Sequence, residues 1–295
     1  ISIAVLLAAF NGERYIREQI DSILFQLGVR TTIYVRDDGS TDGTRAILDH
    51  YAAAYPGRVV LLVDAPRRFG AACENFLSML VELQQAPHDY FAFADQDDVW
   101  LSDKLDRAVR QIVANGASGY ASNLTAFSEL DQSEWVIRKD YPQRRSDYLF
   151  QSASAGCTYV FDAAAARLIA SRIGSVDQHD WNGMSHDWLC YAICRSHGLS
   201  WFIDDWSGIR YRQHALNQFG AMPGFSGAMK RLALMRRGWY RDVLLRNRRF
   251  LNPDNAADQS VLRRVERFNL RDRLWLALHS KELRREPKAQ LGLTA

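Results

Sequence analysis

Short apolar runs alternate with amphipathic stretches along the first half of the chain. The runs are rich in β-branched and aromatic residues, which is typical of buried strands, and apolar residues recur at helical spacing between them. The predicted elements are strands at 1–7, 31–35, 59–63 and 90–94 and helices at 14–26, 44–55 and 71–83. Strands that alternate with helices predict an α/β fold whose sheet is mainly parallel, with right-handed crossovers.

Downstream of residue 111 the pattern is less regular. The predicted elements there are strands at 118–123, 154–161 and 199–203, a loop with a short ribbon over 126–142, a helix at 163–172, and a helical run that follows 185–188 and continues through 192. From residue 225 the chain is helical and basic. An α/β part is therefore followed by a helical part.

Charge marks the same division. The net charge is +3, but residues 224–295 contain 17 Lys and Arg against 7 Asp and Glu, whereas the preceding residues contain 20 and 27. A Pro-Gly breaker at 223–224 coincides with this change of sign. We therefore predict one domain over 1–222 and a basic helical region over 223–295.

Composition excludes several classes of protein. The 295 residues are 47% hydrophobic and 24% charged, as in an ordinary globular protein. No apolar run reaches the roughly eighteen residues of a transmembrane helix. The four cysteines lack C-x-x-C spacing, so we expect them to be reduced, as in a cytosolic protein, and not to bind zinc.

The most informative stretch is Asp95-Gln96-Asp97-Asp98, which places three carboxylates directly after the strand at 90–94. Carboxylates this close raise one another's pKa unless a positive charge compensates, and oxygen ligands suit Mg²⁺ or Mn²⁺. Strand alternation puts Asp95 and Asp97 on one side and Asp98 on the other, although a turn would relax this. A carboxylate cluster at the C-terminal end of a buried strand predicts a metal and ligand site. The alternative is a solvated acidic turn that caps the next helix.

Five motifs occur in order along the chain, most of them where predicted strands end. They are Ala9-Phe10-Asn11-Gly12, the Asp-Asp-Gly-Ser-Thr-Asp-Gly-Thr stretch at 37–44, Asp95-Gln96-Asp97-Asp98-Val99-Trp100, His186-Asp187-Trp188, and Tyr211-Arg212-Gln213-His214 with Asn217. Together they resemble the family 2 glycosyltransferases of GT-A fold, in particular bacterial rhamnosyltransferase-type members. The resemblance covers about residues 1–220, and 225–295 carry no matching motif. It implies a nucleotide-sugar half at about 1–112 and an acceptor half at about 113–222.

The resemblance implies a nucleotide pocket. Asp37 or Asp38, with Asp38 preferred, would accept a hydrogen bond from the N–H of a pyrimidine ring. The alternative is that both only form an Asx-turn, a role that Asp42 already serves. The other nucleotide-binding residues that it implies are Ala9 and Phe10 under the base, Asn11, Asp95, Gln96, and either Arg67 or Arg68, whose guanidinium geometry suits phosphate. For either arginine the alternative is a solvated loop charge.

The resemblance also implies that Asp95 and Asp97 hold Mg²⁺ or Mn²⁺ on the donor diphosphate. His214 would be a further metal ligand or a diphosphate contact, assisted by Arg212 in closing the site, with Gly220 as a hinge. A lone histidine is more often structural, and this alternative stays open.

Asp187 matches the family's catalytic base, which removes the proton of an acceptor hydroxyl as the new bond forms. The alternative for Asp187 is a helix N-cap. His186 and Trp188 would lie on the acceptor side, although Trp188 could equally be part of the core.

The implied reaction is an inverting, metal-dependent transfer of a hexose. The resemblance points to L-rhamnose from dTDP-L-rhamnose, and a UDP-sugar remains an alternative because uracil and thymine offer the same N–H edge. The acceptor would be a growing cell-surface glycan or a lipid-linked glycan such as O-antigen. Two hypotheses compete with this reaction: a non-catalytic nucleotide-sugar-binding protein and a nucleotidyltransferase. A nucleotidyltransferase usually has a Gly- and Lys-rich phosphate loop, which 8–12 lack.

The basic C-terminal region bears on location. Met229, Leu232 and Val243 give an apolar face beside basic residues over about 225–250, which suits the surface of an anionic membrane. The alternatives are a helix packed on the catalytic domain or a dimer contact. We therefore expect a cytoplasmic protein that associates peripherally with the inner face of the cell membrane, leave a homo-oligomer open, and expect no nucleic-acid partner.

Overall fold

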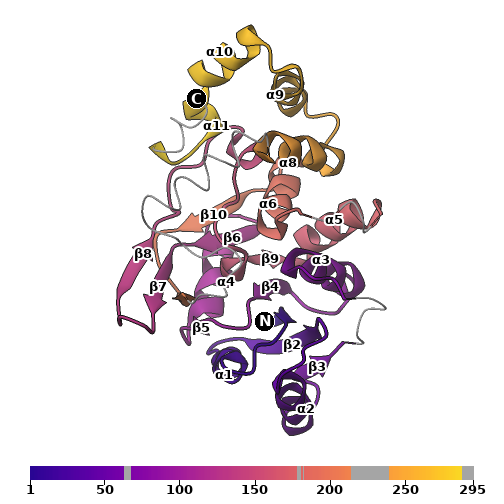
Figure 1. The fold of residues 1–295 in the computed structure, drawn as a ribbon, viewed down its shortest axis with the longest axis vertical. Helices are drawn as coiled ribbons and strands as arrows, with labels where there is room; N and C mark the ends of the chain where they lie inside the picture. Colours follow the sequence, from indigo (N-terminus) through magenta and orange to yellow (C-terminus); the bar gives the residue numbers. More distant parts are fainter. Residues whose placement is uncertain (63–67, 178–180, 182, 214–238, 288–295) are drawn as a thin grey trace.

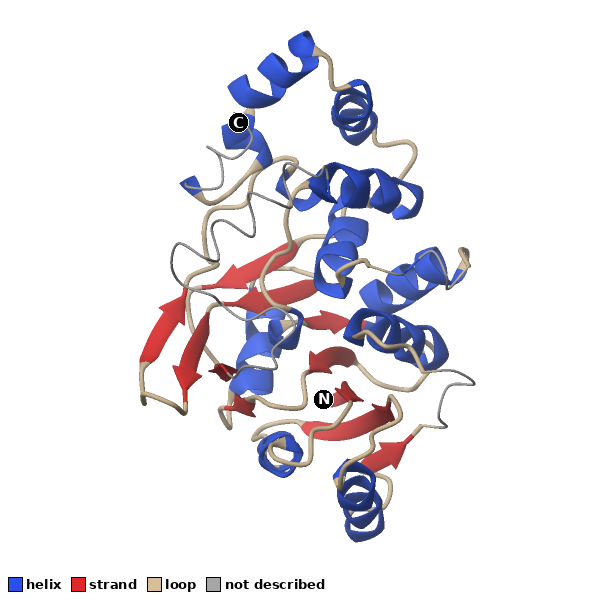
Figure 2. Cartoon of the chain, in the orientation of Figure 1, coloured by secondary structure: helices blue, strands red, loops and turns tan. Residues whose placement is uncertain are grey.

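The computed structural model describes residues 1–62, 68–177, 181, 183–213 and 239–287. Within them, a seven-stranded sheet has the strand order β10-β6-β9-β4-β1-β2-β3, and a four-stranded sheet has the order β5-β11-β7-β8 (Figure 1). Every pairing in the larger sheet is parallel except the two made by β9. Helices cover both faces of this sheet (Figure 2), which confirms the predicted α/β class.

The elements follow the predicted order closely in the first half of the chain. The strands of the larger sheet are β1 (Ser2–Ala9), β2 (Arg30–Asp37), β3 (Val59–Leu61), β4 (Tyr90–Ala94), β6 (Gly119–Ser122), β9 (Val160–Asp162) and β10 (Trp201–Asp204). Those of the smaller sheet are β5 (Val99–Trp100), β7 (Leu124–Ser128), β8 (Glu134–Ile137) and β11 (Ile209–Gln213). The longer helices are α1 (Ile16–Leu24), α2 (Thr44–Ala54), α3 (Ala72–Leu83), α4 (Lys104–Ala114), α5 (Ala163–Gly174), α6 (His186–Ser196), α8 (Trp239–Asn247), α9 (Ala256–Arg267) and α10 (Leu270–Leu278). Three 3-10 turns, η1 (Asp147–Leu149), η2 (Gly156–Thr158) and η4 (Arg248–Phe250), and the short helix α11 (Ser280–Leu283) complete the described elements.

The central strand β1 brings three loops to one edge of the sheet. It pairs in parallel with β2 and β4, in a register that sets Ala9 opposite Asp37 and Leu7 opposite Ala94. Its residues 3–7 are fully buried because helices cover both faces. The carboxyl ends of all three strands therefore deliver the loops that begin at Phe10, Asp38 and Asp95 to the same place, where open α/β sheets bind ligands.

One predicted strand is wrong over most of its length. Residues 154–161 are apolar enough for a strand, but 156–158 form the turn η2, in which the Ala155 carbonyl accepts hydrogen bonds from the Thr158 N–H and hydroxyl (3.0 and 2.7 Å). The strand β9 begins only at Val160 and runs antiparallel between β4 and β6. These local hydrogen bonds of Thr158 replace the bonds that a strand would form with its neighbours in the sheet.

The helices that follow residue 238 pack on the α/β domain. Val243 and Leu244 of α8 are 1% and 3% exposed and share a hydrophobic core with α3, α5 and α6. In the described part of 225–250, burial therefore supports the packed helix and not the membrane-facing surface that Val243 helped to predict. Met229, Leu232 and the predicted boundary at residue 222 lie outside the described residues.

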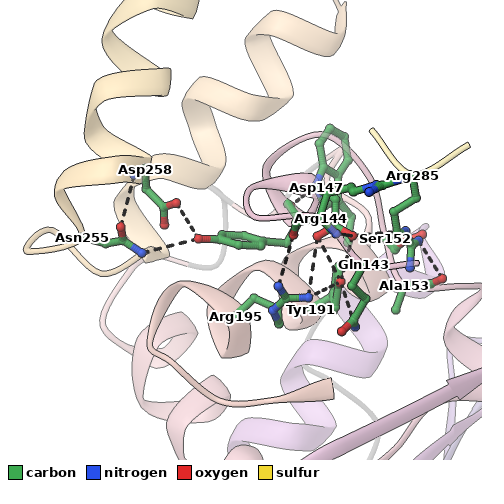
Figure 3. A network of polar contacts seen from close by, with 12 residues as sticks. Gln143, Arg144, Asp147, Ser152, Ala153, Tyr191, Arg195, Asn255, Asp258 and Arg285 are labelled. Carbon is green, nitrogen blue, oxygen red and sulfur yellow. Dashed lines mark hydrogen bonds and ion pairs between the residues drawn. The ribbon is translucent and has the colours of Figure 1, made fainter. Parts of the chain in front are cut away.

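A buried polar network ties the C-terminal helices to η1 and α6 (Figure 3). Asp147, which is fully buried, forms ion pairs with Arg285 (3.3 Å) and Arg195 (3.7 Å). Asp258 of α9, also fully buried, accepts hydrogen bonds from the hydroxyls of Tyr148 (2.5 Å) and Ser196 (2.8 Å). These contacts connect α9 and the residues after α11 to η1 and to α6, the helix whose first turn contains the predicted catalytic Asp187.

All four cysteines are free and buried. Across the described ranges, no helix combines the length and the hydropathy that crossing a bilayer requires.

Candidate active site

Two adjacent carboxylates after β2 are held by different partners. Asp38 accepts hydrogen bonds from the backbone N–H groups of Phe69 and Gly70 (2.6 and 2.8 Å), so it fastens the start of the segment before α3. Asp37 accepts from the N–H and hydroxyl of Ser40 (3.2 and 2.5 Å), which is the turn that the sequence left open as its alternative. Asp38 thus contacts a separate segment of the chain, whereas Asp37 is bonded within its own turn. Which of the two contacts a pyrimidine stays a prediction.

Gln96 fixes the backbone of Phe10. Its amide oxygen accepts from the Phe10 N–H (2.8 Å) and its amide nitrogen donates to the Phe10 carbonyl (2.9 Å). A Cβ atom at Gly12 would lie 2.4 Å from the same amide oxygen, so a larger residue there would displace the Gln96 side chain from Phe10. The arrangement makes Gln96 a positioning residue for the loop after β1.

The loop after β1 and the loop after β2 are locked together. The Asn11 side chain accepts from the Thr41 N–H (2.8 Å), and its own backbone adopts a positive φ of 48°, which asparagine tolerates better than most residues. The Arg68 guanidinium lies 3.9 Å from the centroid of the Phe10 ring. Phe10 and Arg68 are therefore neighbours, as a shared nucleotide pocket requires, whereas Arg67 lies outside the described residues.

The acidic turn between β4 and β5 gathers a different pair of carboxylates from the predicted one. One ligand atom each from Asp95, Asp98 and the Cys157 thiol lie within 4.8 Å of one another. The chain bends at 95–98 instead of continuing as a strand, so the first and fourth residues come together and strand alternation no longer applies. Asp97, predicted to pair with Asp95, is near enough for its charge to raise the pKa of both other aspartates, and its role as a metal ligand stays a prediction.

The electrostatics of this cluster fit a hard divalent cation. Burial, followed by the charges of Asp97 and Asp187, raises the pKa of Asp95 to about 7, and burial also raises the pKa of Asp98 well above its ordinary value. One Asp98 oxygen accepts from the Arg212 N–H (3.2 Å), whereas no N–H or O–H group of the described residues donates to the other, which is buried. Carboxylate oxygens suit Mg²⁺ or Mn²⁺, and the buried thiol, whose pKa is also raised, does not.

Lys104 is a residue of this site that the sequence pattern did not single out. It is 1% exposed, and its ammonium lies 3.4 Å from the centroid of the Trp100 ring with no hydrogen-bond partner among the described residues. Burial lowers the pKa of Lys104 to about 7, while the nearby Cys157 and Asp98 charges oppose that shift. In the sequence, the only indication of this role is that Lys104 follows Trp100 by four residues at the start of a predicted helix. That the lysine is buried near the carboxylates could be seen only in the tertiary structure.

Arg212 of β11 forms hydrogen bonds to two residues of the acidic turn, Asp97 and Asp98. Its backbone N–H bonds Asp98, its Nε donates to the Asp97 carbonyl (2.9 Å), and its guanidinium forms ion pairs with Glu18 and Glu129. The side chain is 3% exposed, so in this state Arg212 positions the turn. Its predicted assistance to closure stays a prediction, and His214 and Gly220 lie outside the described residues.

Asp187 lies in the first turn of α6. Ser185 is the cap residue of this helix, so the structure does not place Asp187 at the N-cap. One Asp187 oxygen accepts hydrogen bonds from the Ser185 hydroxyl and from the Trp188 N–H (2.7 Å). The Asp187 charge is among the causes that raise the pKa of Asp95, so the start of α6 lies near the acidic cluster.

The two neighbours of Asp187 pack in the protein. The His186 ring lies against Phe76 and Phe93, with centroids 4.5 and 5.2 Å away, and burial lowers its pKa. The Trp188 indole N–H donates to the Tyr148 carbonyl (2.9 Å), and Trp188 is 6% exposed, which is the core position that the sequence left open. Their predicted contacts with an acceptor stay predictions.

Ionisation of Asp95 should make metal binding depend on pH. The affinity of the cluster for Mn²⁺ is expected to rise by at least about tenfold per pH unit up to about 7, since a metal must displace the proton of Asp95 and also that of Asp98, whose pKa is raised as well. The sign for stability is opposite: because the folded-state pKa of this carboxyl is raised, the metal-free protein loses stability as the pH rises from about 4 towards 7. Calorimetric Mn²⁺ titrations between pH 5.5 and 8 measure the slope, and Asp95→Asn is the control that should make it shallower, because one of the two titrating carboxyls is removed. An equally strong affinity at all pH values in this range would contradict the raised pKa.

Comparison with known proteins agrees with this geometry. Residues 4–168 match the model of the family described as glycosyl transferase family 2. The chain belongs to this family and is a glycosyltransferase, with the Asp37–Asp38 loop and the acidic turn inside the matched residues.

Among its relatives, the chain is 33% identical to the dTDP-rhamnosyl transferase RfbG of Shigella flexneri over 86% of this chain and 88% of that protein. It is 25% identical to the UDP-Glc:alpha-D-GlcNAc-diphosphoundecaprenol beta-1,3-glucosyltransferase WfgD of Escherichia coli, over 54% of this chain and 60% of that one. The structure of S. aureus TarS 1-349 in complex with UDP superposes with a TM-score of 0.61 at 14% identity, covering 99% of this chain and 83% of TarS. That likeness confirms the GT-A fold.

Proposed function

We propose that this protein transfers L-rhamnose from dTDP-L-rhamnose to a hydroxyl group of a cell-surface glycan, with inversion at the anomeric carbon. The observation that carries the proposal is the meeting of Asp95 and Asp98 at the edge where β1 and β2 also end, with Asp187 facing them from α6. The similarity to RfbG over most of both chains supports the rhamnosyl donor. The similarity to WfgD supports a lipid-linked acceptor, because that enzyme's name describes one.

In the proposed reaction, the residues divide the work between donor and acceptor. Asp38 and Phe10 orient the nucleotide, and Asp95 and Asp98, with Asp97 beside them, would hold Mg²⁺ or Mn²⁺ on the diphosphate. When bound, such a cation offsets the charge that grows on the leaving diphosphate. Arg212 keeps the acidic turn in place through its hydrogen bond to the Asp97 carbonyl, and the Lys104 ammonium lies against Trp100, which follows the turn.

Asp187 acts on the acceptor. Its carboxylate takes the proton of the acceptor hydroxyl while the oxygen forms a bond to the anomeric carbon and the bond from that carbon to the diphosphate oxygen breaks. The Ser185 hydroxyl and the Trp188 N–H both bond one oxygen of this carboxylate, so they hold it in one orientation. The transferred proton ends on Asp187 and dTDP leaves.

A thermal-unfolding panel with Mn²⁺ and dTDP, UDP, GDP, CMP or ATP tests the donor assignment. A ligand at a hundredfold excess over its dissociation constant stabilises the folded protein by about 2.7 kcal/mol. We expect the largest rise in Tm with dTDP, a smaller one with UDP, and the loss of both on removing the metal. A rise with UDP alone would favour a UDP-sugar donor, and no rise with any pyrimidine diphosphate would overturn the donor site.

A further inference from the structure

Helix α10 presents an apolar stripe to solvent. Leu270, Leu274 and Leu278 recur every four residues, which places them along one side of the helix. They are 80%, 60% and 73% exposed, and Phe268, just before the helix, is 45% exposed. Leucine on the outer side of a helix is the reverse of the pattern by which a surface helix packs on a globular protein.

The opposite side of α10 is firmly anchored, so the outward direction of the stripe is set by the fold. Asp272 and Leu276 are 2% and 3% exposed. The Asp272 carboxylate forms ion pairs with Arg264 (3.3 Å) and Arg267 (2.8 Å). The backbone N–H of Asp272 donates to the side-chain oxygen of Asn269, the N-cap of α10 (3.0 Å). Rotating the leucines inward would expose Leu276 and strip a buried carboxylate of both partners.

Positive charge surrounds the stripe. Residues 263–281 contain six Lys and Arg and only two Asp and Glu. Arg271 and Arg273, inside the helix, and Arg263 and Lys281, on either side of it, are exposed. A second copy of the chain docked leucine to leucine would bring these cations together, whereas an anionic surface would pair with them. Apolar side chains rimmed by arginine and lysine are the features by which a helix lies in the surface of a bilayer.

We propose that the α10 stripe, defined by Phe268, Leu270, Leu274 and Leu278, is a docking surface for an anionic lipid bilayer. The sequence pattern predicted a membrane surface at 225–250, and burial of Val243 and Leu244 moves the candidate to this later helix. The stripe lies at the end of the molecule opposite α1 and α2 (Figure 1). Docking there leaves the nucleotide half in the aqueous phase.

Helices α9 and α10 connect the α10 stripe to the acceptor side of the site. α10 packs on α9, whose Asp258 bonds Ser196 at the end of α6, and α6 begins beside Asp187. Docking would therefore orient the start of α6 relative to the bilayer. Only this consequence, for a lipid-linked acceptor, rests on the proposed function; lipid binding itself does not.

Vesicle flotation of the full chain tests the proposal. Vesicles of phosphatidylcholine are compared with vesicles that also contain phosphatidylglycerol, using the wild type, a stripe variant carrying Leu270→Ser, Leu274→Ser and Leu278→Ser, and a matched control carrying Phe25→Ser, Leu27→Ser and Val113→Ser. The three control residues are 65%, 62% and 69% exposed and lie in the first 113 residues of the chain, far in sequence from α10. The stripe variant is expected to lose at least about tenfold in its partition coefficient on phosphatidylglycerol vesicles, because one buried leucine side chain alone is worth about that much. The control should bind like the wild type, and added salt should weaken both.

A second measurement reports on contact directly. A dye sensitive to polarity, attached to Leu274→Cys, should shift its emission to the blue on phosphatidylglycerol vesicles, since the four native cysteines are buried. Equal flotation of the stripe variant and the wild type, or no shift of the dye, would overturn the proposal. A wild-type dimer in sedimentation that the stripe variant loses, without vesicle binding, would assign the stripe to a second copy instead. Donor binding measured in parallel separates these results from a failure of the proposed function.

Discussion

Replacing Asp187 by Asn is expected to lower kcat for sugar transfer by about two to four orders of magnitude, the usual contribution of a positioned general base. Asparagine keeps the shape of the side chain and can still accept from the Trp188 N–H, but it cannot take a proton. Donor binding should survive, because the carboxylates that face the diphosphate are unchanged. Initial rates of dTDP release with acceptor and calorimetric titration with dTDP and Mn²⁺ measure the two effects separately.

A second aspartate at a helix start supplies the matched control. Asp162 is the N-cap of α5 and accepts a hydrogen bond from the Ala165 N–H (2.7 Å), a role that asparagine fills equally well. Asp162→Asn should therefore keep both kcat and donor binding. If Asp187→Asn behaved like Asp162→Asn, Asp187 would be a structural residue and the base would have to be sought elsewhere on the acceptor side.

The second large effect is on stability. Replacing Asp147 by Leu is expected to lower the free energy of unfolding by about 3–5 kcal/mol, because Arg285, which is 5% exposed, would keep a buried charge without its carboxylate. Arg195 also loses a partner, but its side chain is 17% exposed and reaches water more easily. Urea unfolding followed by circular dichroism measures the change, and Asp49→Asn, in an exposed i,i+4 pair, should change little.

A variant that replaces both Asp147 and Arg285 distinguishes two explanations of this loss. Either the ion pair stabilises the fold, or the loss arises only because one charge is left buried without its partner. Burial raises the pKa of Asp147 although the charges of Arg285 and Arg195 lower it. The free-energy cost of removing this carboxylate from water is therefore larger than its favourable interaction with the two arginines. Asp147→Leu combined with Arg285→Met should therefore recover most of the loss. A double variant as unstable as the sum of the two single variants would mean that the two side chains are not energetically coupled, and would contradict this interpretation.

The parts of this protein that depend on local pattern could be predicted from its amino-acid sequence. The run of buried residues in β1, the strand β4 and the acidic turn after it were all readable, because hydrophobic periodicity and turn residues act over a few positions. The order of strands and helices then placed the loops after β1, β2 and β4 at one edge, since parallel strands with crossovers have little choice of geometry. The family resemblance rested on the same local motifs.

The tertiary structure decided which side chains meet. Asp98 joins Asp95 because the chain bends after β4, and the two-residue strand β5 forms only by pairing with β11, more than a hundred residues later in the sequence. Arg212 of β11 reaches the acidic turn through that pairing, and Lys104, the first residue of α4, lies against Trp100 of β5.

The C-terminal helices show the same limit. The 3.6-residue period of a helix identifies an apolar side but does not say what covers it. Val243 and Leu270 are both apolar residues in basic helices, yet one is 1% exposed and the other 80%. Only the docking of α8 and α9 on α5, α6 and η1 assigned the first to the core and the second to the surface, because burial is a property of the neighbours that a helix finds and not of its own residues.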